Sequence, residues 1–209
     1  MFILEHETQT LNLKSGRLCL DFANTADWHT SDQPEEQLNS YTDLVEWAKG
    51  VGILTEGQAQ QLASAVMNRS TEVADVLARA IDFREAIFRI FSAVSRGTSP
   101  AEADLAILNE VLAAALGRLQ LISTPDGFSW EWNAGRDNLD QMLWPVAQSA
   151  ADLLTSEELS RVGQCADDNC GWLFMDMSRN RSRRWCDMGD CGNRAKARRH
   201  YQRKRSAGK

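Results

Sequence analysis

Four cysteines near the C-terminal end constrain this chain more than any other feature. They form two pairs with four intervening residues each, Cys165 with Cys170 and Cys186 with Cys191. In a reducing compartment, thiols with this spacing are more often metal ligands than disulfides. Zn²⁺ takes four thiolates in a tetrahedron at about 2.3 Å, and two cysteines on one tight turn can fill two of its corners. We therefore expect one structural zinc ion at these four residues, with an iron–sulfur cluster or redox disulfides as the alternatives.

The segment that carries these cysteines has too few apolar side chains to fold unaided. Residues 161–209 contain nine sizeable apolar groups in 49 residues, whereas metal coordination can contribute on the order of 10 kcal/mol of folding free energy. We expect a turn at each cysteine pair, a short hairpin that begins at Gly171, and a helix that starts at Gly192 or Asn193, as in a treble-clef finger. The sequence therefore predicts two domains, residues 1–160 and 161–209.

Charge divides the chain at the same place. From Arg161 onward, thirteen Arg and Lys residues face five Asp, a net charge of +8, and no acidic residue follows Asp190. The first 160 residues hold ten basic and twenty-four acidic side chains, a net charge of −14, which the whole-chain value of −6 conceals. This asymmetry indicates an acidic body with a basic end that faces a polyanion; the alternative is a solvated or disordered terminus.

The expected C-terminal helix is basic on nearly every side. Like charges three and four positions apart repel one another, so a bound polyanion would relieve that repulsion. If about five to seven of these side chains met phosphates, log K would fall with log salt at a slope of roughly −4.5 to −6. The residues that we expect to bind nucleic acid are Arg194, Lys196, Arg198, Arg199, Arg203, Lys204 and Arg205.

Two stretches of the sequence resemble known families. The C-terminal segment is similar to the CGNR zinc finger in the residues Cys165, Cys170, Gly171-Trp172-Leu173-Phe174, Asp176, Ser178-Arg179-Asn180, Arg183-Arg184-Trp185-Cys186, Met188, Cys191-Gly192-Asn193-Arg194, Lys196 and Arg198. The body resembles the ABATE domain in the run from Gly16 to Thr25 and in Phe83-Arg84-Glu85-Ala86. In that family the finger follows an ABATE domain in bacterial transcription regulators. The resemblance thus implies zinc at the four cysteines and a regulatory role.

Hydrophobic periodicity in the body predicts a mainly helical fold with a small β component. Apolar residues at helical spacing predict helices over about 44–51, 55–66, 73–94 and 99–116, and a last one over 139–154 that bends at Pro145. Alternation at Leu18, Leu20 and Phe22 predicts a short N-terminal strand. Alternating apolar residues on both sides of residues 124–127 predict a β-hairpin.

The body offers one set of residues that could bind a small effector. Arg84 could pair with an anion, and tryptophans could form the walls of a pocket. The residues of this candidate site are Asp21, Asn24, Trp28, Trp47 and Arg84. The alternative is that Arg84 bonds Asp21 or a helix end while both tryptophans belong to the core.

Other classes of function find little support in the sequence. No nucleophile elbow, P-loop, dinucleotide-binding or zinc-protease motif occurs, and four thiolates would close a zinc site, so we do not expect an enzyme. No apolar run approaches the roughly 20 residues of a membrane span, and no secretory signal opens the chain, so we expect a cytoplasmic protein without membrane contact.

These observations favour a two-part DNA-binding transcription regulator. The mainly helical body would sense an effector or form a homodimer, and the zinc finger would present its basic helix to DNA. The alternative is a zinc-finger module that binds acidic protein surfaces or RNA without sequence-specific DNA binding.

Overall fold

The computed structural model describes residues 11–135 and 138–207. The described chain is mainly helical, and its strands form three separate antiparallel pairs. The helices are α1 (Leu18–Ala23), α2 (Tyr41–Val51), α3 (Glu56–Asn68), α4 (Ser70–Ser95), α5 (Glu102–Leu116), α6 (Leu143–Leu154) and α7 (Asn193–Ala207), with short turns η1 (Glu157–Arg161) and η2 (Met188–Gly192). The strands are β1 (Ala26–Asp27), β2 (Glu35–Glu36), β3 (Leu119–Thr124), β4 (Gly127–Trp132), β5 (Val162–Gln164) and β6 (Leu173–Met175). The predicted fold class is therefore confirmed.

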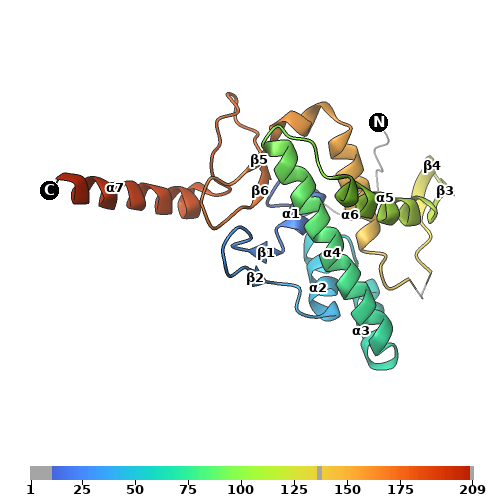
Figure 1. Cartoon of the computed structure of the whole chain (residues 1–209). Coiled ribbons are helices and arrows are strands. Elements are labelled where there is room, and N and C mark those ends of the chain that lie inside the picture. The colour runs from blue at the N-terminus through green and yellow to red at the C-terminus, as the bar shows by residue number, and fades with distance from the viewer. Residues whose placement is uncertain (1–10, 136–137, 208–209) are drawn as a thin grey trace.

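The longest helix, α4, runs through the whole body and contacts α1, α2, α3, α5 and the strands β5 and β6 (Figure 1). Its fully buried side chains include Phe83, Ile87, Ile90 and Phe91, which recur at helical spacing as the sequence predicts. The neighbouring helices bury their own apolar stripes against this row. The body therefore has one continuous hydrophobic core with α4 at its centre.

The helices α2 and α3 begin at polar caps. The Ser40 hydroxyl accepts a hydrogen bond from the N–H group of Asp43 at the start of α2. Thr55 and Gln58 form a reciprocal capping box at the start of α3, as their spacing of three residues indicates. These caps fix where both helices begin.

The first helix, α1, contradicts the prediction of an N-terminal strand. The alternation of Leu18, Leu20 and Phe22 suggested a strand, but this segment is helical. Because α1 packs against α4, α6 and β6, its apolar side chains are buried on nearly every side. A helix without an exposed face lacks the polar positions that reveal a period of 3.6 residues, so a short alternation misleads.

The helix α6 contradicts the prediction of a bend. It begins at Leu143, so Pro145 lies in its first turn. The first four N–H groups of a helix have no acceptor within it, and a proline there removes no hydrogen bond. The predicted bend at Pro145 therefore has no physical cause.

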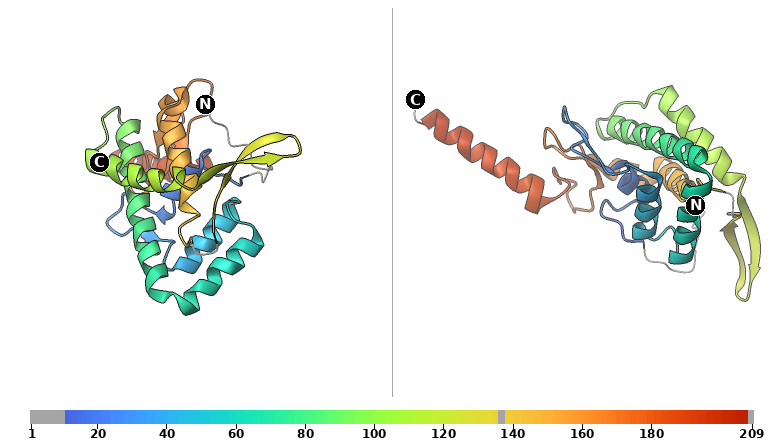
Figure 2. Two further views of the ribbon diagram at one scale, coloured as in Figure 1. Left: turned by 90° about the vertical axis from the view of Figure 1, so that its right-hand side faces the viewer. Right: turned by 90° about the horizontal axis from the view of Figure 1, so that it is seen from below.

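The strands β3 and β4 form the predicted hairpin. Thr124 pairs with Gly127 across a two-residue loop, and Gly127 adopts a positive φ of 135°. At the base of the hairpin, Trp132 packs against Trp144 of α6 with ring centroids 5.9 Å apart. Beyond this contact the hairpin projects from the helical body (Figure 2).

The strands β5 and β6 join the cysteine-bearing segment to the core of the body. They pair antiparallel, with Val162 opposite Met175, and they contact α4. Val162, Leu173 and Met175 are buried in the same apolar cluster as Phe83. The sequence predicts a hairpin that begins at Gly171, whereas in the structure β6 pairs with the residues before the first cysteine pair. That pair therefore occupies the loop of the hairpin.

No helix in the described ranges combines the length and the apolar character that crossing a bilayer requires.

Candidate zinc centre and basic surface

The four predicted metal ligands lie in two loops and in the short turn η2 before α7. Cys165 follows β5, and its N–H group donates to the Trp172 carbonyl at 2.8 Å. Cys170 closes the same loop shortly before β6. Cys186 lies in the next long loop, and Cys191 lies in η2, directly before α7. The structure thus brings together side chains from two loops that the sequence separates by fifteen residues.

The four sulfur atoms have the arrangement that one zinc ion requires. Their Sγ atoms all lie within 4.8 Å of one another, and Cys186 Sγ lies 3.5 Å from those of both Cys170 and Cys191. Four sulfurs at about 2.3 Å from a central ion form a tetrahedron with edges of about 3.8 Å. Three of the four cysteines are buried. The site fits one structural zinc ion with no position open to a substrate.

The chemistry of the donor set points the same way. Hydrogen bonds to the sulfurs of Cys165 and Cys170 raise the pKa of Cys186, and burial raises the pKa of Cys191. Four crowded thiols therefore cannot all ionise without a compensating cation. Thiolates are soft ligands, and Zn²⁺ both supplies the missing positive charge and accepts a tetrahedron of sulfur atoms.

A loop of the body supports the first cysteine pair from outside. The N–H group of His29 donates to the Cys170 carbonyl at 3.1 Å, and the Thr30 hydroxyl donates to the Asp168 carbonyl at 3.0 Å. Gly171 adopts a positive φ of 68°, and a Cβ atom there would lie 2.5 Å from the Thr30 side chain. Only glycine meets both conditions. The body and the zinc site are therefore in direct contact.

Arg194, at the start of α7, lies against the zinc site. Its Nη2 donates to Cys191 Sγ at 2.8 Å, its Nε donates to the Asp167 carboxylate at 3.3 Å, and its Nη1 pairs with Asp190. Its guanidinium also lies 4.5 Å from the centroid of the Trp28 ring. Four thiolates around Zn²⁺ carry a net charge of about −2. Arg194 therefore offsets negative charge at the metal and links α7 to the body.

Asp167 anchors a second arginine of the same helix. Arg198, one turn after Arg194, donates to the Asp167 carboxylate at 3.2 Å. The side chain of Asp167 is 1% exposed, so this carboxylate is a buried anchor for the first two turns of α7. Asp167 is not among the site residues that the sequence predicts. The available signal was an acidic residue two positions after a cysteine, opposite two arginines at i and i+4.

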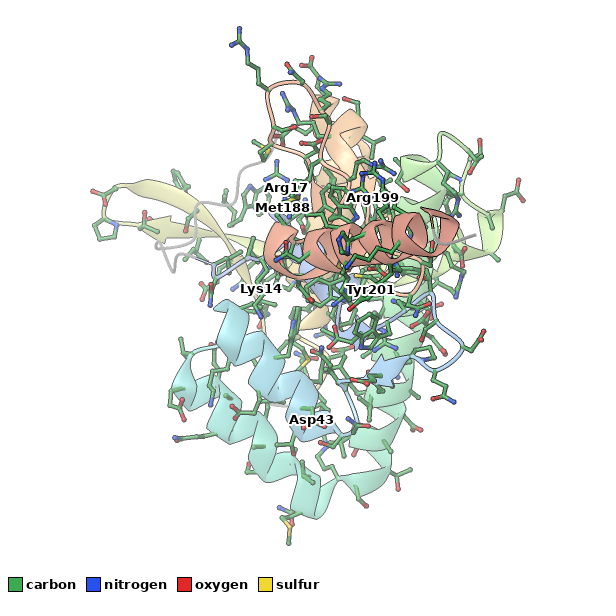
Figure 3. The ribbon with its side chains drawn as sticks, turned by 90° about the vertical axis from the view of Figure 1, so that its left-hand side faces the viewer. Lys14, Arg17, Asp43, Met188, Arg199 and Tyr201 are labelled. Carbon is green, nitrogen blue, oxygen red and sulfur yellow. The ribbon has the colours of Figure 1, made fainter. Side chains whose placement is uncertain are left out.

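The remaining basic residues of α7 face solvent. Lys196, Arg199, Arg203 and Lys204 are exposed, and no ion pair involving them occurs within the described ranges. The helix leaves the body as a straight arm (Figures 1 and 2). Figure 3 shows Arg199 and Tyr201 on opposite sides of α7. The side chain of Arg205, also expected to bind nucleic acid, lies outside the described residues.

Two of the five residues expected to bind an effector hold the backbone together. The Asp21 carboxylate accepts hydrogen bonds from the N–H groups of Lys14 and Ser15. Asn24 is buried, and its amide forms two hydrogen bonds to the backbone of Leu173, one as donor at 2.8 Å and one as acceptor at 2.9 Å. Asn24 therefore joins the end of α1 to β6.

The other three residues also have separate partners. Trp28 lies under Arg194, as described above, and Trp47 packs against Phe22 with ring centroids 5.0 Å apart. Arg84 is buried, forms a bidentate pair with Glu36 at 2.5 and 2.7 Å, and donates to Glu85 at 2.8 Å. A surface cavity at the end of α4 and at η1 is lined by none of the five. These contacts give each residue a local structural partner, and an effector at these positions stays a prediction.

Comparison with known protein families divides the chain where its charge changes sign. Residues 16–157 match ABATE, described as "Putative stress-induced transcription regulator", and residues 161–204 match the CGNR zinc finger. No curated protein matches the chain. The first match ends at the start of η1 and the second begins at its last residue, Arg161, just before β5 and the first cysteine pair.

Proposed function

Because the chain belongs to the ABATE family and carries a CGNR zinc finger, we propose that it is a transcription regulator that binds duplex DNA through α7. One observation carries this proposal. The helix is fixed at its first two turns by the zinc site and by Asp167, and it presents the exposed basic residues Lys196, Arg199, Arg203 and Lys204 to solvent.

The dimensions of α7 suit the major groove of DNA. Its 15 residues span about 22 Å, and a groove about 12 Å wide admits one α-helix. The four exposed basic residues would meet phosphates or base edges. The first 160 residues carry a net charge of −14, so DNA repels the body and favours approach by the arm alone.

Within this proposal the basic residues of α7 have two roles. Arg194 and Arg198 hold the helix against the zinc site and Asp167, whereas Lys196, Arg199, Arg203 and Lys204 are available to the nucleic acid. The sequence alone predicts that all of them bind nucleic acid, and for Arg194 and Arg198 this stays a prediction. The proposed contact surface therefore lies on the side of α7 that does not face Asp167.

The test is DNA binding by the zinc-loaded full chain, measured over a range of salt concentrations with selected and nonspecific duplexes. Arg199→Ala/Arg203→Ala should weaken binding and make the salt slope shallower by about 2, while zinc content stays at one per chain. Arg79→Ala/Arg118→Ala, two basic residues of the body, is the matched control and should bind like the wild type. Absence of a wild-type complex at low salt, or tighter binding to structured RNA or to an acidic protein, would contradict the proposal.

For the body we propose that it forms a homodimer through the β3–β4 hairpin. Residues opposite one another in an antiparallel pair share a face, and here one face carries an apolar row without charged residues. The row consists of Leu119, Leu121, Phe128, Trp130 and Trp132. Leu121 is 57% exposed and Phe128 is 76% exposed. Such a face fits an identical face across a two-fold axis, and DNA-binding dimers are common.

The dimer is tested by light scattering during size-exclusion chromatography. Phe128→Ser/Trp130→Ser should convert a dimer to a monomer without loss of zinc, whereas Phe128→Leu should not. A monomeric wild type would contradict the role of the hairpin and would favour the other role expected for the body, effector sensing. In that case at least one metabolite in a broad screen should raise the melting temperature of the protein by several degrees.

We also infer that the zinc ion has no catalytic role. Four thiolates complete its coordination, whereas catalytic zinc keeps a position for water or substrate. Visible spectra of the Co²⁺-substituted protein test this, because a closed site should show no change when small anions are added.

A further inference from the structure

We propose that the arginine-rich loop Ser178–Arg184 is a second phosphate-binding element, which grips the DNA backbone beside the groove that α7 enters. This inference rests on the proposed function and assigns a role to residues outside α7. The loop contains four arginines and no acidic residue.

The loop is held in a fixed shape by one buried carboxylate. Asp176 accepts hydrogen bonds from the N–H groups of Ser178 at 2.8 Å and Arg183 at 2.9 Å, one near each end of the loop. The N–H group of Ser182 donates to the Ser178 hydroxyl at 3.1 Å across it. Although burial opposes ionisation, these hydrogen bonds lower the pKa of Asp176. The loop is therefore preorganised, which reduces the entropy cost of binding.

Two of the four arginines are engaged within the protein. The Arg183 guanidinium lies 4.4 Å from the centroid of the Phe174 ring and donates to the Trp185 and Cys186 carbonyls. Arg181 donates to the Ser160 hydroxyl at 3.0 Å. Both side chains stabilise the loop and its attachment to η1.

The other two arginines are available for a ligand. Arg179 and Arg184 are exposed, and neither has an ion pair with any acidic group of the described chain. The Arg184 carbonyl accepts from the N–H group of Ala166 at 2.8 Å, so its backbone is fixed to the first cysteine loop. A fixed backbone with a free cationic side chain is typical of a phosphate contact.

Trp185 joins this loop to α7. The Arg184 guanidinium carbon lies 5.4 Å from the centroid of the Trp185 ring, and that of Arg199 lies 5.9 Å from the same ring. The two guanidinium carbons are therefore at most about 11 Å apart, which is within the roughly 12 Å width of the major groove. When α7 lies in the groove and Arg199 contacts the DNA there, Arg184 reaches the phosphates at the edge of the groove.

Electrostatics favours an anion at this junction. Two guanidinium groups against one indole ring repel each other, and the described contacts place no carboxylate between them. A phosphate near both would be attracted to each and would offset their repulsion. The junction at Trp185 thus has the charge and the spacing to bind a duplex along its backbone.

The experiment compares the salt dependence of duplex binding by the zinc-loaded full chain and its Arg179→Ala/Arg184→Ala variant. The variant should show a slope shallower by about 2 and an affinity about tenfold or more lower at 0.1 M salt. Arg179→Lys/Arg184→Lys should retain the wild-type slope, because lysine also neutralises phosphate. Arg79→Ala/Arg118→Ala again controls for total charge, and zinc content reports on folding.

The outcomes separate this inference from the proposed function. The wild type and the zinc-loaded Arg179→Ala/Arg184→Ala variant could bind duplex with the same steep dependence of log K on log salt. This result would overturn the loop contact and leave the role of α7 intact. A wild type that binds no duplex would overturn both. If the alanine variant loses zinc, Arg179→Gln/Arg184→Gln takes its place and is judged by the same slope.

Discussion

The two halves of this protein are stabilised in different ways. The ABATE body buries large apolar side chains such as Phe83 and Phe91 from several helices in one core. The finger has a small cluster of its own, in which Cys165, Cys170 and Cys191 are buried and Trp172 and Trp185 pack against them. The buried apolar residues Val162, Leu173 and Met175 of β5 and β6 belong to the core of the body. Because these residues pack in the core of the body, the rest of the finger has few apolar contacts and depends on the metal for its fold.

The boundary between the two halves is therefore not the boundary between apolar and metal-bound parts. β5 and β6 pack with the body, while the loops from Cys165 onward and α7 depend on the zinc ion. We predict that metal removal disorders the loops from Cys165 onward and α7, and leaves β5 and β6 folded against the body.

Removal of zinc should disorder the finger and spare the body. Zinc coordination contributes on the order of 10 kcal/mol to folding in such modules, whereas the helical core contains no ligand. A strong chelator, or Cys170→Ser, should expose the chain after Cys165 to limited proteolysis and abolish DNA binding. Circular dichroism should still show cooperative melting of the body. Loss of that transition would contradict the division, and Cys19→Ser, a cysteine outside the cluster, is the control.

Substitution of Asn24 should weaken the joint between the halves. Asn24→Ala would leave the backbone N–H and carbonyl groups of Leu173 buried without partners, at a cost of about 3 kcal/mol in the free energy of unfolding. Urea denaturation measures this cost. Asn39→Ala, an exposed residue with one hydrogen bond, should change stability by well under 1 kcal/mol. Equal effects from both would show that Asn24 is not a structural joint.

Substitution of Asp167 should act on the zinc site and on α7. Asp167→Asn removes the charge that pairs with Arg194 and Arg198. Partners beyond the metal ligands are commonly worth 10–100-fold in metal affinity, so zinc affinity should fall by about tenfold, as measured by competition with a chromophoric chelator. Asp168→Asn is the neighbouring control. Unchanged affinity in Asp167→Asn would leave the anchor without an energetic role.

Glu85 should make the body lose stability in acid. Although burial opposes its ionisation, hydrogen bonds and charges from His29 and Arg84 hold the pKa of Glu85 at about 2 against an ordinary value of 4.5. A lowered pKa stabilises the fold above about pH 4.5, and this contribution disappears as pH falls toward 2. We predict that the free energy of unfolding of the wild type at pH 6 is about 1–2 kcal/mol larger than that of Glu85→Gln.

The pH profile supplies the control for this last prediction. The difference in the free energy of unfolding between the wild type and Glu85→Gln should decrease steadily as the pH falls from 4.5 to 2, as measured by urea denaturation. A difference that is constant over this range would mean that the Glu85 carboxylate is not stabilised by its partners. Acid also protonates the zinc thiolates, but this affects both proteins equally.

The sequence predicted the features that depend on local pattern. The capping box at Thr55, the hairpin around residues 124–127 and the start of α7 all follow from residues close together in the chain, and the structure has each of them. The four cysteines were recognisable because metal geometry limits their spacing. Local chemistry and the requirements of one ion thus carried these predictions.

Features that depend on distant contacts could not be predicted. The α1 segment looked like a strand because burial on nearly every side hides helical periodicity. The contact of Arg194 with Trp28, 166 positions earlier, could not be read from the sequence either, and DNA binding by Arg194 stays a prediction. Arg84 likewise meets Glu36 instead of Asp21 or a helix end. In each case the partner belongs to another element, so only the folded chain reveals it.

The central claim is that one zinc ion, bound by four thiolates, organises the finger and positions α7. Zinc analysis and X-ray absorption at the zinc edge, on protein purified under reducing conditions, test it most directly. The account predicts one zinc per chain with four sulfur neighbours at about 2.3 Å. A folded chain without stoichiometric metal, or a zinc ion with nitrogen or oxygen among its four ligands, would contradict it.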